Sequence, residues 1–243
     1  MSIWNKIFYQ FKKRIRPFLN PKMVHFIGDS HADIFWQMEF SPFYFWNIIP
    51  KIKVVHGATT TGLANPNSKT QALKIFETYI QEEIKTNHYV VFQLGEVDCG
   101  FAIWYRAEKH QISIDEQLNQ ALNNYTRLLN KTMSINGHKT IVCSAILPTI
   151  QDGQNFGQVA NLRREVKANL NERTALSLRF NAALQKICNT NSLIFLNLDQ
   201  YLLDPKKQIL KAHFLHHDPT NHHLNPKPLM AVLNTELNKK IFS

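Results

Sequence analysis

The chain has 243 residues, of which 44% are hydrophobic and 19% are charged, and these proportions exclude a wholly disordered protein. Its net charge of +10 favours anionic partners such as lipid headgroups, an acidic glycan or nucleic acid. The sequence has no zinc-finger spacing and no RNA-binding signature, so nucleic-acid binding is not expected. Cys99, Cys143 and Cys188 are too few and too far apart for a disulfide framework or a zinc site, which favours a reducing compartment.

Residues 3–18 form a pattern typical of a basic amphipathic helix that ends near Pro17 and Pro21. Its apolar residues recur at helical spacings, and its cations fall mostly elsewhere around the turn. The apolar residues are Trp4, Ile7, Phe8, Phe11, Ile15 and Phe18, and the basic ones are Lys6, Lys12, Lys13 and Arg14. Two interpretations stay open: the helix lies on an anionic membrane, or it docks on the rest of the domain.

This helix divides the chain into residues 1–21 and one larger domain, residues 22–243. Charges throughout residues 1–20 interrupt any apolar core, so a signal peptide is not expected. No stretch approaches the roughly 20 apolar residues needed to span a bilayer. We therefore expect a cytoplasmic protein, with contact at the inner face of the membrane as the open alternative.

Strand-like and helix-like patterns alternate after the first helix. We expect strands at residues 23–28, 52–56, 89–94, 140–146 and 193–198, and helices at 68–86, 114–135, 171–189 and 227–241. Ser68 is the expected N-cap of the first of these helices. Because several strands are apolar nearly throughout, they are expected to be parallel and covered by helices on both faces. The polar stretch 151–169 is interpreted as an insertion that covers the site.

The most informative motif is Gly28-Asp29-Ser30-His31, directly after the apolar run of residues 23–27. A glycine at the end of a strand permits a sharp turn, which presents Ser30 at the carboxyl edge of the sheet, where open α/β sheets bind ligands. A serine hydroxyl becomes a nucleophile only with a base and a group that orients the base. The last part of the chain supplies candidates in Asp218, His222 and His223.

Together, the Gly-Asp-Ser start and the Asp…His-Leu-Asn end resemble the SGNH/GDSL hydrolase superfamily, over roughly residues 23–240. The resemblance implies a three-layer α/β/α sandwich with a central, mostly parallel, five-stranded sheet of flavodoxin-like type. It also implies a Ser-His-Asp triad with Ser30 as nucleophile and Asp218 as the orienting acid. We favour His223 as the base because Leu-Asn follows it, whereas His222 better fits the family's short Asp-to-His spacing.

The resemblance further implies an oxyanion hole made of the Ser30 amide, a glycine after the second strand and an asparagine after the third. Gly57 and Gly62 are both candidates for the glycine, and Gly62 is favoured, with a plain turn glycine as the alternative. The third block reads Gly95-Glu96-Val97-Asp98, so a valine stands where the family has its asparagine donor. Losing one such donor costs about 10²–10³ in rate. The block is similar to a GEIDC variant found in proteins linked to surface-polysaccharide biosynthesis.

Two acidic residues flank this valine, and two roles are open for them. Glu96 and Asp98 either contact the substrate, by orienting an arginine such as Arg106 or binding sugar hydroxyls, or Asp98 caps the following turn. His31 lies either in the pocket or on the surface, and His25 and His56 are expected to be core histidines. The late histidines lack the spacing of a known metal site, so neither a metal nor another cofactor is expected. These are His213, His216, His217, His222 and His223.

The function that the resemblance implies is hydrolysis of O-acyl esters, above all O-acetyl groups, on a carbohydrate or a surface-polysaccharide precursor. An acyltransferase with the same triad is the first alternative. The second is a non-catalytic protein of polysaccharide assembly, which Val97 and the stretched final block favour. Specificity is assigned to the loops 99–113 and 151–169, whose aromatic residues are Phe101, Trp104, Tyr105 and Phe156. The acyl group, the glycan, the acceptor and the oligomeric state stay open.

Overall fold

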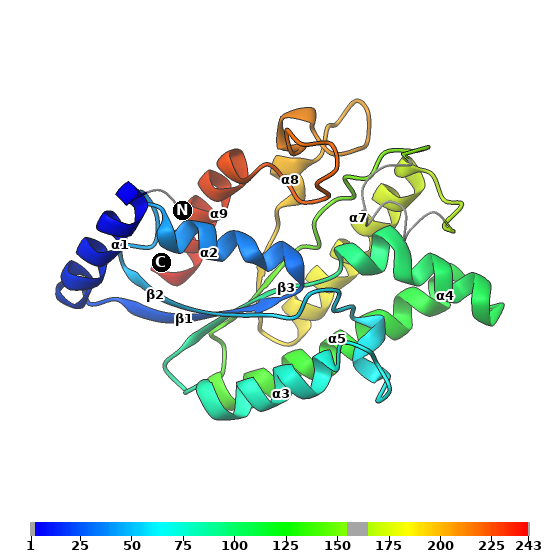
Figure 1. The fold of residues 1–243 in the computed structure, drawn as a ribbon. Coiled ribbons are helices and arrows are strands. Elements are labelled where there is room, and N and C mark those ends of the chain that lie inside the picture. Colours follow the sequence, from blue (N-terminus) through cyan, green and yellow to red (C-terminus); the bar gives the residue numbers. More distant parts are fainter. Residues whose placement is uncertain (1–2, 155–164, 243) are drawn as a thin grey trace.

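Parallel strands in the order β2-β1-β3-β4-β5 form the sheet at the centre of the protein (Figure 1). The computed structural model describes residues 3–154 and 165–242, and the strand bounds below refer to this part of the chain. The strands are β1 (Lys22–Gly28), β2 (Ile48–Val54), β3 (Tyr89–Gln93), β4 (Thr140–Cys143) and β5 (Ile194–Leu196). The order reverses between β1 and β3, and in sheets of this type ligands bind at that switch point.

Helices cover both faces of the sheet (Figure 1). On one face α3 (Ala72–Glu83), α5 (Ile114–Asn136) and α7 (Leu170–Thr190) pack against strand residues such as Ile27 and Phe92. On the other face α2 (Ile34–Phe40) and α9 (Pro226–Ile241) pack against residues such as Phe26. Successive residues of β1 thus enter different cores, which is why the strand is apolar nearly throughout.

Shorter elements complete the fold. α1 (Ile3–Ile15) and the 3₁₀ turn η1 (Arg16–Leu19) lie beside α2, and α4 (Ile103–His110) contacts α5. α8 (Asp199–Leu202) follows β5. The remaining turns are η2 (Ser30–Asp33), η3 (Thr61–Ala64), η4 (Asp98–Ala102) and η5 (Ala212–Phe214). None of the described helices is long and apolar enough to cross a membrane.

The expected α/β/α sandwich with its five-stranded parallel sheet is confirmed, and the differences lie at element ends. β2 begins at Ile48 instead of 52, and it includes Pro50, which an edge strand tolerates. Ser68 is not the N-cap of α3; the helix begins after Gln71, whose backbone takes a positive φ of 49°. The chain is still turning at Ser68, because the Gln71 amide donates to the Ser68 carbonyl at 3.1 Å.

The segment 99–113, expected as a loop, is mostly helical, since it contains η4 and α4. Trp104 fixes this turn by donating its indole N–H to the Cys99 carbonyl at 2.8 Å. Part of the expected covering segment, residues 155–164 with Phe156, lies outside the described residues. All three cysteines are buried, and burial raises the pKa of Cys143 and of Cys188 to about 12, so these two thiols are poor nucleophiles.

Candidate active site

Ser30 is positioned by a close contact between the ends of β1 and β3. A Cβ on Gly28 would lie 2.2 Å from the carbonyl oxygen of Gln93, so only glycine fits there. The next residue, Asp29, donates its amide to the same Gln93 oxygen and accepts the His31 amide on Oδ1 at 2.9 Å. This cap begins η2 and holds Ser30 half-buried at the carboxyl end of β1.

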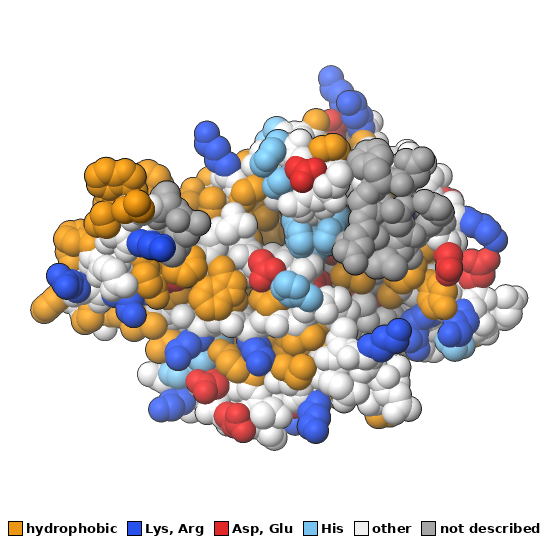
Figure 2. All heavy atoms as spheres, in the orientation of Figure 1, with side chains coloured by type: hydrophobic (Ala, Val, Ile, Leu, Met, Phe, Trp, Pro, Cys, Tyr) orange, Lys and Arg blue, Asp and Glu red, His pale blue; other side chains and the backbone are white. Residues whose placement is uncertain are grey.

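A pocket of about 210 Å³ joins this turn to the last part of the chain. Ser30 and His31 line it from the first motif, and Asn221 and His223 line it from the last one. Further lining residues come from η2, α2, α9, the segment after β4 and the loop between η5 and α9: Asp33, Ile34, Gln37, Ile146, His216, Leu224, Pro226 and Leu229. Figure 2 shows histidine side chains gathered near the centre of this face. The topology therefore brings together Ser30 and His223, which are far apart in sequence.

The imidazole of His223 is oriented by Asn221. Oδ1 of Asn221 accepts the backbone N–H of His223 at 2.9 Å and lies 3.0 Å from its Nδ1. Since this oxygen can only accept, Nδ1 carries the ring proton and Nε2 keeps its lone pair. Nε2 is buried and has no hydrogen-bond partner among the described residues. Burial, and after it the neighbouring His31 and His222, lower the pKa of His223 to about 3, so the ring is neutral at pH 7.

Asp218 does not have the role expected from the sequence. It is exposed, and its carboxylate accepts both the amide and the hydroxyl of Thr220, at 2.9 and 2.7 Å. These hydrogen bonds hold its pKa below the ordinary value. The physical reason is local: Asp218 caps its own turn, and Asn221 is the residue whose side chain reaches His223. His222, the second candidate base, packs edge-on against His31, with ring centroids 5.8 Å apart.

A buried histidine–carboxylate pair lies beside this site. Nε2 of His31 lies 3.2 Å from Oε2 of Glu96, and both side chains are almost fully buried. The ring of His31 meets that of His223 at 62°, with centroids 4.9 Å apart. His31 thus lies in the pocket, one of the two positions expected for it. The pairing with Glu96 was not predicted, since it depends on β1 and β3 being neighbours in the sheet.

Asp98 fixes the loop that follows β2. One carboxylate oxygen accepts the Thr60 amide at 2.7 Å and the other accepts the Thr61 amide at 2.9 Å. Burial raises the pKa of Asp98, although these hydrogen bonds oppose the shift. Asp98 therefore caps the turn that follows β2, whereas the sequence had suggested that it caps the turn directly after itself. It does not pair with Arg106, whose Nε is buried without a hydrogen-bond partner in the described structure.

The two glycines proposed for the oxyanion hole differ in whether their backbone N–H groups already donate a hydrogen bond within the described residues. The Gly62 amide donates to the Thr59 carbonyl at 3.1 Å and to the Thr59 hydroxyl at 2.9 Å, so it is not available to a ligand. Within the described residues, the Gly57 amide has no such acceptor. Gly57 takes a positive φ of 74° and follows His56, which pairs with Asp33 at the pocket rim. The geometry therefore favours Gly57 over Gly62.

The third block contributes by packing. Gly95 has a φ of 116°, and a Cβ there would lie 2.8 Å from Cβ of Ala145, so the chain passes too close for any side chain. Val97, at the start of η4, supplies no side-chain donor.

His25 and His56, both expected in the core, lie in different environments. His25 is buried and bonded to Tyr79 and His88, as expected for a core histidine. His56 is not a core residue, because its side chain is 71% exposed. Within the described residues, no group of three or more His, Cys, Asp or Glu side chains could hold a metal ion.

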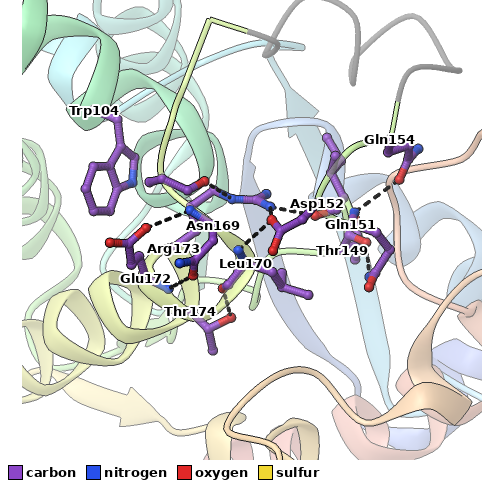
Figure 3. A network of polar contacts seen from close by, with 12 residues as sticks. Trp104, Thr149, Gln151, Asp152, Gln154, Asn169, Leu170, Glu172, Arg173 and Thr174 are labelled. Atoms are coloured by element: carbon purple, nitrogen blue, oxygen red, sulfur yellow. Dashed lines mark hydrogen bonds and ion pairs between the residues drawn. The ribbon is translucent and has the colours of Figure 1, made fainter.

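A polar network lies at the start of α7 and joins it to the segment after β4 (Figure 3). Arg173 binds Asp152 at 3.0 Å and the Ile150 carbonyl at 2.9 Å, and Asp152 also accepts the Leu170 amide. Arg173 thus holds the segment that contains Ile150 and Asp152. Thr149, which directly precedes it, donates its hydroxyl to the His222 carbonyl at 2.6 Å. The ends of the expected covering segment are thereby tied to the backbone beside His223.

Comparison with known proteins gives matches at the level of structure. No protein-family model and no curated protein matches the chain. Its fold is similar to that of a Streptococcus pneumonia protein proposed to be a platelet activating factor, with a TM-score of 0.58 and 15% identity, over 98% of this chain and 92% of that one. It is also similar to a carbohydrate acetylesterase family member from Sinorhizobium meliloti (TM-score 0.55, 12% identity, 91% and 100% covered). A third match is a proposed arylesterase from Agrobacterium tumefaciens (TM-score 0.53, 12% identity, 91% and 98% covered).

The strand order and the layers define an α/β/α protein whose pocket with Ser30 and His223 lies at the carboxyl end of β1. More particularly, the chain shares its fold with the proposed arylesterase and the carbohydrate acetylesterase family member among its structural neighbours. At these identities the likeness concerns the fold, and the chemistry has to be argued from the residues of the pocket.

Proposed function

We propose that this protein is a serine esterase that removes short O-acyl groups, above all acetyl, from a carbohydrate or a surface-polysaccharide precursor. The observation that carries the proposal is the shared pocket of Ser30 and His223, in which Nε2 of His223 is unprotonated and has no hydrogen-bond partner within residues 3–154 and 165–242. A neutral imidazole beside a half-buried serine is the pairing that activates a hydroxyl nucleophile. Asn221 takes the orienting role that the sequence had suggested for Asp218.

The reaction would proceed through an acyl-enzyme. Nε2 of His223 takes the proton of Ser30 as Oγ attacks the ester carbonyl, and the tetrahedral oxyanion is bound by the Ser30 and Gly57 amides. The imidazolium then gives its proton to the departing sugar oxygen as the C–O bond breaks. Water, deprotonated by the same nitrogen, attacks the acyl-serine. As the bond to Oγ breaks and the acid leaves, the imidazolium returns this proton to Ser30 Oγ, which restores the free enzyme.

Two observations support the choice of substrate class. The pocket of about 210 Å³ is small, which suits an acetyl group better than a long acyl chain. The carbohydrate acetylesterase family member among the structural neighbours has the same fold. Transfer of the acyl group to a sugar hydroxyl, the acyltransferase alternative, would use the same residues, with the sugar replacing water in the second step.

The test measures hydrolysis of p-nitrophenyl acetate at about pH 8, where His223 is neutral. The proteins compared are the wild type, Ser30→Ala, His223→Ala and His222→Ala. Ser134→Ala, an exposed helix serine, is the matched control. We expect turnover to fall by about 10³ or more in Ser30→Ala and His223→Ala and to persist in the other two variants. A fluorophosphonate probe should label the wild type and not Ser30→Ala.

Each contrary outcome points to one alternative. Loss in His222→Ala but not in His223→Ala moves the base to His222. A labelled Ser30 without hydrolysis, together with acetyl transfer to an added sugar, identifies an acyltransferase. Neither label nor turnover in the wild type would overturn the esterase and favour the non-catalytic assembly protein.

A further inference from the structure

The helix α1 attaches to the protein through its charged side. Lys12 is 1% exposed, and its ammonium donates to the Ser41 and Tyr44 carbonyls at 3.1 Å each and to the Glu39 carbonyl. Arg16, just after the helix, forms two hydrogen bonds with the Glu39 carboxylate, at 3.1 and 2.8 Å. An amphipathic helix on the surface of a globular protein normally buries its apolar stripe instead.

The apolar side of α1 consequently faces outward. Most of its large hydrophobic side chains, with two of η1, are between 40% and 87% exposed, and Figure 2 shows hydrophobic side chains interspersed with lysine and arginine at this end of the molecule. We call these residues the apolar face of α1: Ile3, Trp4, Ile7, Phe8, Phe11, Phe18 and Leu19. Exposed apolar patches built from one helix mark interaction sites, because scattered single residues would not repeat at helical spacing.

The charge around this face has one sign. Residues 1–28 contain six lysines and arginines and no acidic residue. Two of the six, Lys12 and Arg16, pair with the single carboxylate of Glu39, whereas Lys6, Lys13 and Arg14 are exposed beside the apolar face. Basic residues next to a helix face rich in tryptophan and phenylalanine are the composition of helices that lie in the interface of an anionic bilayer.

We propose that the apolar face of α1 docks on the surface of an anionic lipid bilayer, with the helix axis in the membrane plane. A second copy of this chain fits the face less well, since a symmetric contact would bring Lys6, Lys13 and Arg14 of both copies together. An acidic glycan would satisfy the cations but leave the apolar side chains in water. A bilayer satisfies both, because acyl chains accept the aromatic side chains and phosphate groups pair with the cations.

The docked face is connected to the pocket through α2. Tyr9 of α1 packs edge-on against Phe40 of α2 at 5.0 Å, and Phe40 stacks with Trp36, which is 45% exposed. The same helix supplies Gln37 to the pocket that holds Ser30. Docking through α1 would therefore fix how the pocket is oriented relative to the membrane.

The experiment is co-flotation of the full chain with vesicles of phosphatidylcholine, pure or with about 30% phosphatidylglycerol. We expect binding to the phosphatidylglycerol vesicles and little to the neutral ones. Trp4→Glu/Ile7→Glu should reduce binding at least about tenfold, whereas Trp4→Phe should retain it. Lys6→Glu/Lys13→Glu should reduce binding at least about tenfold, and the charge-matched control Lys206→Glu/Lys207→Glu, in the exposed turn before η5, should not. All these positions are exposed, so circular dichroism and Tm should match the wild type.

Several results would overturn the proposal. They are no binding to anionic vesicles, equal binding by Trp4→Glu/Ile7→Glu, and a wild-type dimer in sedimentation that these two substitutions dissociate. A protein that ignores vesicles but binds an acidic polysaccharide, with binding lost only in the lysine variants, would assign the surface to a glycan instead.

Discussion

Oδ1 of Asn221 lies 3.0 Å from Nδ1 of His223, and a neutral amide thus occupies the position where a serine hydrolase usually has a carboxylate. The amide fixes the same tautomer as a carboxylate would. It provides no negative charge to stabilise the imidazolium that would form if His223 took the serine proton, as we propose. In that proposal His223 is a weak base, which agrees with its lowered pKa of about 3.

Replacing Asn221 by aspartate should strengthen this base. In the Asn221→Asp variant a carboxylate would face Nδ1, favour the charged ring and raise the pKa of His223. The wild-type ring stays neutral down to about pH 3, so kcat/KM should show no fall near pH 6.5 as the pH is lowered. In the variant, kcat/KM should begin to fall at a pH at least one unit higher than the pH at which it falls in the wild type. The kcat of the variant near pH 8 should be about tenfold higher. Profiles of kcat/KM against pH measure both effects.

Asp218→Asn is the matched control for this prediction. Its carboxylate caps the turn at Thr220 in solvent, so the variant should keep the wild-type pH profile and lose little stability. A profile altered by Asp218→Asn and unchanged by Asn221→Asp would reverse the assignment of the orienting residue.

Asp98 should be needed as a carboxylate, because its two oxygens accept two different backbone amides. In Asp98→Asn one oxygen becomes an NH₂ group that faces an N–H, so one buried hydrogen bond is lost, at a cost of about 1–3 kcal/mol. The loop with Gly57 should loosen, which lowers both Tm and kcat. Chemical denaturation and ester hydrolysis measure the two effects.

Asp204→Asn provides the comparison, since Asp204 is only half-buried and also accepts two amides, but with a single oxygen, at 2.9 and 3.1 Å. Asparagine keeps such an oxygen, so Tm should hardly change. An equal fall in Tm in the two variants would show that stability does not depend on Asp98 accepting two amides with two different oxygens.

Asp29 should make the protein less stable as the pH rises. Burial raises the pKa of Asp29 to about 6 from 3.8, and its Oδ2 has no hydrogen-bond partner in the part of the chain that the structure describes. Between these pH values the folded state holds a proton that the unfolded state has lost, so the free energy of unfolding falls as the pH rises through this window. Asp29→Asn keeps the cap on His31 without the charge. It should be the more stable protein above pH 6, by about 3 kcal/mol at most, and equal to the wild type below pH 4.

Urea denaturation of both proteins at several pH values tests this, with the exposed Asp115→Asn as control. A stability difference that does not change with pH would contradict the assigned titration.

Features that depend on residues close together in the sequence could be predicted, whereas contacts that depend on the strand order could not. β1 and Ser30 follow from a short apolar run and one glycine, which act within ten residues. The pairing of His31 with Glu96 joins residues 65 apart and follows only from the strand order. Asn221 had a local signal that was missed: an asparagine two residues before His223 readily accepts its amide, which places the side chain against the ring. α2 has seven residues, too few for a helical period to stand out.

The attachment of α1 provides the last prediction, because Glu39 is the buried acid that faces both Lys12 and Arg16. Glu39→Gln leaves two buried cations without a counter-charge, which should cost about 3–5 kcal/mol. In the wild type, burial lowers the pKa of Lys12 to about 8 from 10.5, although Glu39 opposes the shift; without Glu39 this pKa falls further, so stability should be regained as the pH rises toward 10.5 and Lys12 loses its proton in the folded state. Glu77→Gln, which breaks a half-exposed pair with Lys131, should cost less than about 1 kcal/mol at any of these pH values. Urea denaturation between pH 7 and 10 separates the two variants, and an equal, pH-independent loss in both would refute the role given to Glu39.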